Sequence, residues 1–157
     1  MKQRLVAASL VLSAAGLVSL ALKEGYTGQA VRPLPGDVPT YGFGTTTKTD
    51  GTPVKIGDKI TPPQALARKF EDIQKFEGAI KKCVRVPLHQ HEYDAYLSLA
   101  YNIGQSAFCT STLVSKLNVG DYTGACREIL RWNRFKGQVV NGLTVRRESE
   151  YKTCIGS

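Results

Sequence analysis

Residues 24–44 read EGYTGQAVRPLPGDVPTYGFG, and this stretch decides how the rest of the chain is organised. It opens on the carboxylate of Glu24 and continues into a segment rich in Gly, Pro and Thr. From Val38 to Thr47, residues typical of strands are interleaved with Gly, and Asp50-Gly51 further on is a tight-turn signal. We therefore predict a small β-hairpin region that follows Glu24 in the chain.

The residues before Glu24 predict a weak membrane anchor. Lys2 and Arg4 precede 18 uncharged residues, 5–22, half of which are Ala, Ser or Gly. Such a run is at the short limit for a spanning helix, and its small residues favour the hydrocarbon core little. The basic start predicts the N-terminus inside and the rest of the chain outside. We expect an anchor that can leave the membrane. A permanent anchor and a signal peptide cut after Ala21 remain as alternatives.

Downstream of the hairpin region the sequence predicts helices. Thr61-Pro62-Pro63-Gln64 matches a capping box, and apolar residues recur at helical spacing after it. These apolar residues are Leu66, Phe70, Ile73, Phe76 and Ile80. Further helices are predicted over 90–102, 111–117, 122–132 and 143–154, with Gly104 as the C-terminal cap of the first of them.

The order of these elements predicts an α+β fold. A weakly hydrophobic N-terminal helix is followed by a small hairpin region and a mainly helical body. We assign residues 1–22 to the signal-anchor and residues 23–157 to one folded domain. A chain of 157 residues suits this reading, because a single domain of that size buries about two-thirds of its unfolded surface.

The charge of the chain indicates the kind of partner. Lys and Arg number 21 against 13 Asp and Glu, which gives a formal net charge of +8. Such a chain is attracted to polyanions, among them nucleic acid, anionic lipid and the bacterial envelope. Because no nucleic-acid-binding motif is present, we do not expect nucleic acid to be the partner.

The four cysteines, Cys83, Cys109, Cys126 and Cys154, indicate disulfides in an oxidising compartment. Their number admits three pairings, and buried free thiols are the alternative. No CxxC pair occurs, and His89 and His91 have no third ligand nearby in the sequence. We therefore expect no metal site.

Glu24, Asp37 and Thr40 are the candidate catalytic residues. Cleavage of a glycosidic bond needs an acid that protonates the leaving oxygen and a partner that positions water or stabilises an oxocarbenium-like centre. An acid seated against apolar surface keeps its proton near neutral pH, and the end of an apolar helix offers such a seat. Asp37 and Thr40, on the hairpin region, would supply the facing side of a cleft.

The whole arrangement resembles the phage-type lysozymes of glycoside hydrolase family 24. In that family a Glu-Gly pair opens the catalytic motif and a Thr-hydrophobic-Gly-x-Gly hairpin closes it, as Glu24-Gly25 and residues 40–44 do here. The resemblance continues nearly to the C-terminus. It runs through Tyr101-Asn102-Ile103-Gly104, Gly120-Asp121, Gly124-Ala125-Cys126, Leu130-Arg131-Trp132, Gly142-Leu143, Arg146-Arg147-Glu148 and Cys154.

This resemblance implies a lysozyme-like fold and a monomeric endolysin without a cofactor. Its activity would be hydrolysis of the β-1,4 bond between N-acetylmuramic acid and N-acetylglucosamine in peptidoglycan, which lyses the host cell. The weak anchor beside Glu24 is similar to the signal-arrest-release branch of these enzymes. In that branch the inner membrane holds the enzyme, with its catalytic domain in the periplasm, until the anchor leaves the bilayer. The resemblance also favours the pairs Cys83–Cys109 and Cys126–Cys154.

The chain departs from the family at the catalytic aspartate. The family usually places Asp nine residues after the Glu and six before the Thr, and these offsets fall here on Pro33 and Leu34. Either Asp37 takes the role from a shifted position, or it is only a turn residue and no aspartate has the role. The missing aspartate keeps one rival open, a lytic transglycosylase, which needs one acid. A second rival, from another class, is a non-catalytic wall-binding or membrane-lesion protein.

Overall fold

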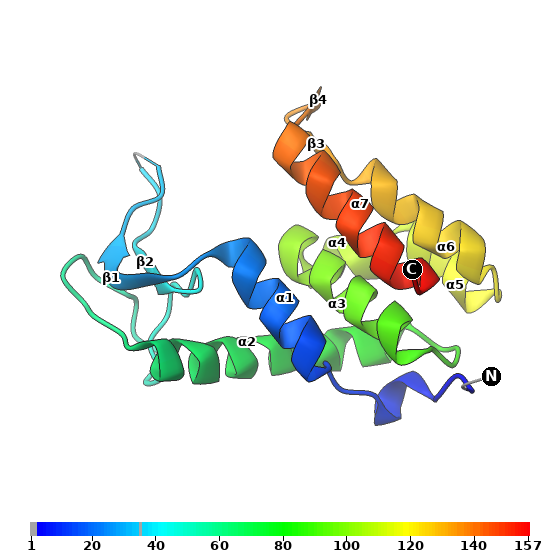
Figure 1. The fold of residues 1–157 in the computed structure, drawn as a ribbon, viewed down its shortest axis with the longest axis horizontal. Coiled ribbons are helices and arrows are strands. Elements are labelled where there is room, and N and C mark those ends of the chain that lie inside the picture. Colours follow the sequence, from blue (N-terminus) through cyan, green and yellow to red (C-terminus); the bar gives the residue numbers. More distant parts are fainter. Residues whose placement is uncertain (1–2, 35) are drawn as a thin grey trace. The chain divides into compact units, whose positions relative to one another are not determined.

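A computed structural model describes residues 3–34 and 36–157 of the chain (Figure 1). The chain divides into two compact units. We call residues 17–74 the hairpin unit, and residues 75–157 with the N-terminal residues through Gly16 the helical unit. Two helices contain residues of both units, α1 (Ala14–Glu24) and α2 (Pro62–Cys83).

The hairpin unit is built on two short antiparallel strands. Strand β1 (Thr27–Val31) pairs with β2 (Thr40–Gly42), with Val31 opposite Thr40 and an irregularity within the pairing. Ala30, Tyr41 and Val54 form its small core, against which Ile60 packs. The predicted turn at Asp50-Gly51 is confirmed, because the Gly51 N–H donates to the Lys48 carbonyl over 3.0 Å.

The helical unit confirms the helices that the sequence predicted. Helix α3 packs against α7, and α5 packs against α6. A short helix α4 and a hairpin of β3 and β4 complete the unit, and the sequence analysis missed all three. The elements are α3 (Gln90–Ile103), α4 (Gln105–Cys109), α5 (Thr112–Asn118), α6 (Tyr122–Glu128), a 3-10 turn (Ile129–Arg131), β3 (Arg134–Phe135), β4 (Gln138–Val139) and α7 (Asn141–Ile155).

Both expected disulfides are present in the helical unit. Cys83–Cys109 and Cys126–Cys154 join residues 26 and 28 positions apart in the sequence. On the chain-entropy model, closing loops of this length stabilises the fold by about 3–4 kcal/mol each.

The buried face of α2 differs from the predicted one. Ile73 and Ile80 are fully buried, as expected, but Leu66 is 40% and Phe70 is 44% exposed. In their place the first turns of the helix bury Ala65 and the charged Lys69. The apolar spacing therefore located the helix correctly, but the face predicted for its first half was wrong.

The N-terminal run is not one continuous helix. A 3-10 turn (Ala7–Ser9) comes first, the backbone from Leu10 to Ser13 is irregular, and α1 begins only at Ala14. Among the residues that the structure describes, no helix combines the length and the apolar character needed to cross a bilayer.

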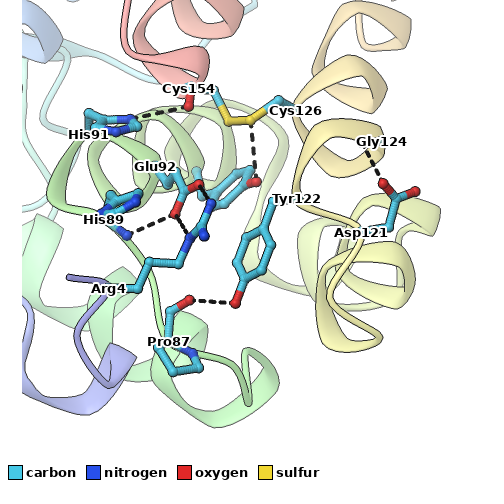
Figure 2. A network of polar contacts seen from close by, with 11 residues as sticks. Arg4, Pro87, His89, His91, Glu92, Asp121, Tyr122, Gly124, Cys126 and Cys154 are labelled. Atoms are coloured by element: carbon cyan, nitrogen blue, oxygen red, sulfur yellow. Dashed lines mark hydrogen bonds and ion pairs between the residues drawn. A yellow bond between two sulfur atoms is a disulfide. The ribbon is translucent and has the colours of Figure 1, made fainter. Parts of the chain in front are cut away.

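Residues 3–13, which we call the N-terminal arm, lie on the helical unit. Leu5 and Leu88 exchange two backbone hydrogen bonds of 2.7 Å. The Arg4 guanidinium donates to both carboxylate oxygens of Glu92, over 3.1 and 2.8 Å, and lies 3.7 Å above the Tyr122 ring (Figure 2). The hydrogen bond with Glu92 raises the pKa of Arg4, although partial burial opposes that shift. A double hydrogen bond between charged groups is stronger and more directional than a single neutral one.

Two more carboxylates hold the end of the arm. The Leu12 N–H donates to Glu77 over 2.6 Å, and the Ser13 N–H donates to Asp94 over 3.0 Å. Gly16 leaves little room for a side chain, since a Cβ there would lie 2.6 Å from Leu12 Cδ1 and 3.0 Å from the Asp94 carboxyl carbon. The arm is therefore held by directional bonds to buried and half-buried acids as well as by apolar contact.

Candidate active site

Glu24 is the last residue of α1 and is half-buried. The helix ends there because Gly25 adopts a φ of +71°, a conformation that glycine reaches at little cost, while its N–H donates to the Ala21 carbonyl. The Glu24 carboxylate lies against the turn that follows β2: a Cβ on Gly44 would be 3.5 Å from Glu24 Oε2. The structure thus places the Glu24 carboxylate beside the glycine-rich turn.

The tight turn that follows β2 requires glycine for its backbone conformation and its close packing. Tyr41 and Thr45 exchange backbone hydrogen bonds of 3.1 and 3.0 Å, which closes a tight loop of three residues. Gly42 has a φ of +61°, and a Cβ on it would lie 2.9 Å from the Ala65 Cβ. The Thr-Tyr-Gly-Phe-Gly pattern is thus explained by a tight turn packed closely against the start of α2.

Aromatic contacts hold the chain just after Glu24. The Tyr26 and Phe43 rings lie with their centroids 5.5 Å apart, a tilted contact of the kind that stabilises aromatic pairs. The Tyr26 hydroxyl also donates to the Ile60 carbonyl over 2.8 Å. The segment that leaves the acid is therefore attached to the turn that faces it.

The other two candidate residues have different surroundings. Thr40 is half-buried at the first position of β2, two residues before the glycine turn. Asp37 is exposed in the connection ahead of β2, and its N–H donates to the Leu34 carbonyl over 3.1 Å, as in a turn. Within residues 3–34 and 36–157, no hydrogen bond or ion pair involves its carboxylate. The structure brings Glu24 to the turn that follows Thr40, and the catalytic roles of Glu24, Asp37 and Thr40 stay predictions.

Sequence reasoning missed two cations beside this site. Arg68 and Lys69 on α2 are buried, and they donate to the Thr47 and Phe43 carbonyls over 3.0 and 3.3 Å. Their positions carried a weak signal, because Lys69 lies four residues before the buried Ile73 and so shares its helix face. A lysine in a hydropathy pattern is ordinarily assigned to solvent.

Comparison with known proteins places the chain in a family. The family model described as Phage lysozyme matches residues 21–150. An endolysin of Acyrthosiphon pisum secondary endosymbiont phage 1 is 41% identical, over 88% of this chain and 94% of the relative. A SAR-endolysin of Pseudomonas phage phiKMV is 37% identical, over 99% of this chain and 93% of the relative. The solved structure of an endolysin from Escherichia coli O157:H7 phage FAHEc1 superposes with a TM-score of 0.87 at 36% identity, covering 94% of this chain and 95% of that one. The chain therefore belongs to the phage lysozyme family and is a lysozyme-type glycoside hydrolase.

Proposed function

We propose that this endolysin hydrolyses the β-1,4 bond between N-acetylmuramic acid and N-acetylglucosamine, with Glu24 as the general acid. Peptidoglycan is its substrate, as the endolysin relatives imply. The observation that carries the proposal is the Glu24 carboxylate lying against the Gly44 turn. A half-buried acid beside a rigid backbone turn is held in one place, which is what proton transfer to a bound sugar requires.

The proposed reaction has one proton donor and one attacking water. Glu24 protonates the glycosidic oxygen, the bond to the anomeric carbon breaks, and an oxocarbenium-like centre develops. Water held by Thr40 attacks that carbon and passes its proton to the Asp37 carboxylate, leaving a reducing N-acetylmuramic acid end. The net charge of +8 concentrates the enzyme on the anionic wall.

Zymography on cell walls followed by mass spectrometry of the products tests this proposal. Glu24→Gln removes the proton donor and is expected to lower the rate by roughly 10²–10⁴-fold. Asp37→Asn and Thr40→Ala, assayed beside it, report separately on the water. Reducing muramic ends support hydrolysis, whereas anhydro ends would identify a transglycosylase. Full lysis by Glu24→Gln would rule out the proposed acid.

We also propose that the N-terminal run first holds the enzyme in the inner membrane, with the catalytic domain in the periplasm, and then leaves the bilayer. The SAR-endolysin relative supports this reading. The ion pair of Arg4 with Glu92 would belong to the later, released state, because an N-terminus that stays inside would keep Arg4 on the cytoplasmic side, away from Glu92 in the exported domain. The docked arm and a spanning segment therefore exclude each other, and the docked arm corresponds to the released enzyme.

A further inference from the structure

Helix α2 contains a buried ammonium group that the proposed reaction does not use. Lys69 is 0% exposed, although lysine is almost never fully buried unless its charge is paired. Removing a charge from water costs several kcal/mol, and hydrogen-bond acceptors must offset that cost. One acceptor is the Phe43 carbonyl, 3.3 Å from Lys69 Nζ.

The carbonyl that Lys69 contacts belongs to the turn at the candidate acid. Phe43 is joined by its peptide bond to Gly44, the residue against which the Glu24 carboxylate lies. A hydrogen bond to the Phe43 oxygen fixes the plane of that peptide, because the peptide unit is rigid. The orientation of the backbone that Glu24 faces is thus tied to the position of Lys69.

The side chains near this turn contact different parts of its backbone. The Thr45 hydroxyl is buried, and it has no hydrogen-bond partner among the residues that the structure describes. Arg68, next to Lys69, holds the Thr47 carbonyl beyond the far end of the turn, where it also pairs with Glu71. Lys69 is therefore placed to set the Phe43–Gly44 peptide, and Arg68 to set the segment after it.

We propose that Lys69 is a positioning residue for the reaction, which keeps the Phe43–Gly44 peptide in the orientation that Glu24 needs. This inference rests on the proposed role of Glu24 as the acid. Lys69 does not touch the substrate in this proposal; it acts only through the turn. Its loss should lower the rate of the chemical step and leave substrate binding and the fold largely intact.

Lys69→Met tests the proposal, because methionine fills a similar volume and carries no charge. On solubilised peptidoglycan strands we expect kcat to fall about tenfold, within the range for misplaced catalytic groups, while KM changes less than about twofold. The melting temperature should fall by only a few degrees, because the hydrogen bonds that are lost are partly offset by the desolvation cost of the ammonium that is removed with them. Lys69→Arg, which restores a buried donor, should recover most of kcat. Lys82→Met, at an exposed lysine of the same helix, is the matched control.

Two results would overturn the inference. An unchanged kcat in Lys69→Met would remove any role in the reaction. A lowered melting temperature, together with a kcat that returns to the wild-type value when the assay is run at a lower temperature, would make Lys69 a residue of stability alone. Glu24→Gln, measured on the same strands, separates the two proposals. If Glu24→Gln is inactive and Lys69→Met is active, only the role of Lys69 fails, whereas an active Glu24→Gln overturns the assignment of the acid itself.

Discussion

Glu92→Gln is the substitution that reports most directly on how the N-terminal arm is held. The amide side chain of this variant is expected to keep the cap of α3, because its oxygen can still accept from the His89 N–H, which donates to Glu92 over 2.8 Å. The change thus removes one charge and leaves the helix start intact. What it weakens is the double hydrogen bond with Arg4.

The magnitude follows from the burial of the two side chains. Glu92 is 4% exposed and Arg4 is 35% exposed, so the pair lies between a buried and a surface ion pair. Breaking a buried pair costs about 3–5 kcal/mol and a surface pair contributes about 0–1 kcal/mol, which gives about 2 kcal/mol here. That free energy corresponds to a change of about 30-fold in the ratio of docked to undocked arm.

Amide hydrogen exchange on the purified soluble protein measures this ratio. The Leu5 and Leu88 amides donate hydrogen bonds to each other's carbonyls, so they should exchange with solvent about 30-fold faster in Glu92→Gln. Amides of α7 should be unaffected, and Glu148→Gln, at an exposed acid of α7, should behave as wild type. If Leu5 keeps its wild-type exchange rate, the ion pair does not hold the arm and our reasoning fails. A uniform acceleration of all amides would instead report global destabilisation.

Three further predictions follow from other parts of the molecule. Replacing several Ala or Ser of the N-terminal run with Leu should keep the protein in the membrane and silence it; lysis on the normal schedule, with the variant in the soluble fraction, would refute the release proposal. Gly42→Ala should lower the free energy of unfolding in urea by about 2 kcal/mol, because it adds a Cβ 2.9 Å from the Ala65 Cβ at a positive φ. Gly51→Ala, also at a positive φ but in open space, isolates the backbone part of that cost. The Lys116 ammonium, hydrogen-bonded to Glu128, holds the pKa of that carboxyl below its ordinary 4.5. The ionised Glu128 therefore stabilises the fold at pH values above its ordinary pKa, and this stabilisation is lost as the pH falls through its lowered pKa. On acidification, the free energy of unfolding should then fall by about 0.5–1 kcal/mol more in wild type than in Glu128→Gln. Equal losses in the two proteins would contradict a stabilising ion pair between Lys116 and Glu128.

Local signals predicted most of the fold correctly. The capping box predicted the start of α2, where Gln64 Oε1 accepts from the Thr61 N–H over 3.0 Å. Gly104, with a φ of +92°, ends α3 as its position indicated. These features depend on a few neighbouring residues, so a sequence pattern specifies them.

Features that depend on partners distant in sequence were harder to predict. Burial of Lys69 depends on acceptors such as the Phe43 carbonyl, which lies 26 positions away. A hydropathy pattern depends on neighbouring residues, so it cannot predict a hydrogen-bond acceptor that lies so far away in the sequence. The N-terminal run has a similar ambiguity: its residues suit a helix in lipid, but in the structure the Leu12 and Ser13 N–H groups donate to acids of the helical unit instead of continuing a helix. The candidate site was located through Glu24 and the glycine turn. The role of Asp37 could not be derived, because the usual spacing is absent.

Because of the two disulfides, the stability of this protein depends on the redox state of the compartment that it occupies. Cys126–Cys154 links α6 to the end of α7, and Cys83–Cys109 links the end of α2 to α4. A reducing cytoplasm keeps thiols unpaired, so newly made chains in it lack about 6–8 kcal/mol of cross-link stabilisation. Since whole domains are stable by only about 5–15 kcal/mol, chains retained in the cytoplasm should be readily degraded by host proteases. Under the proposed export, the durable form of the enzyme would therefore be found in the oxidising compartment.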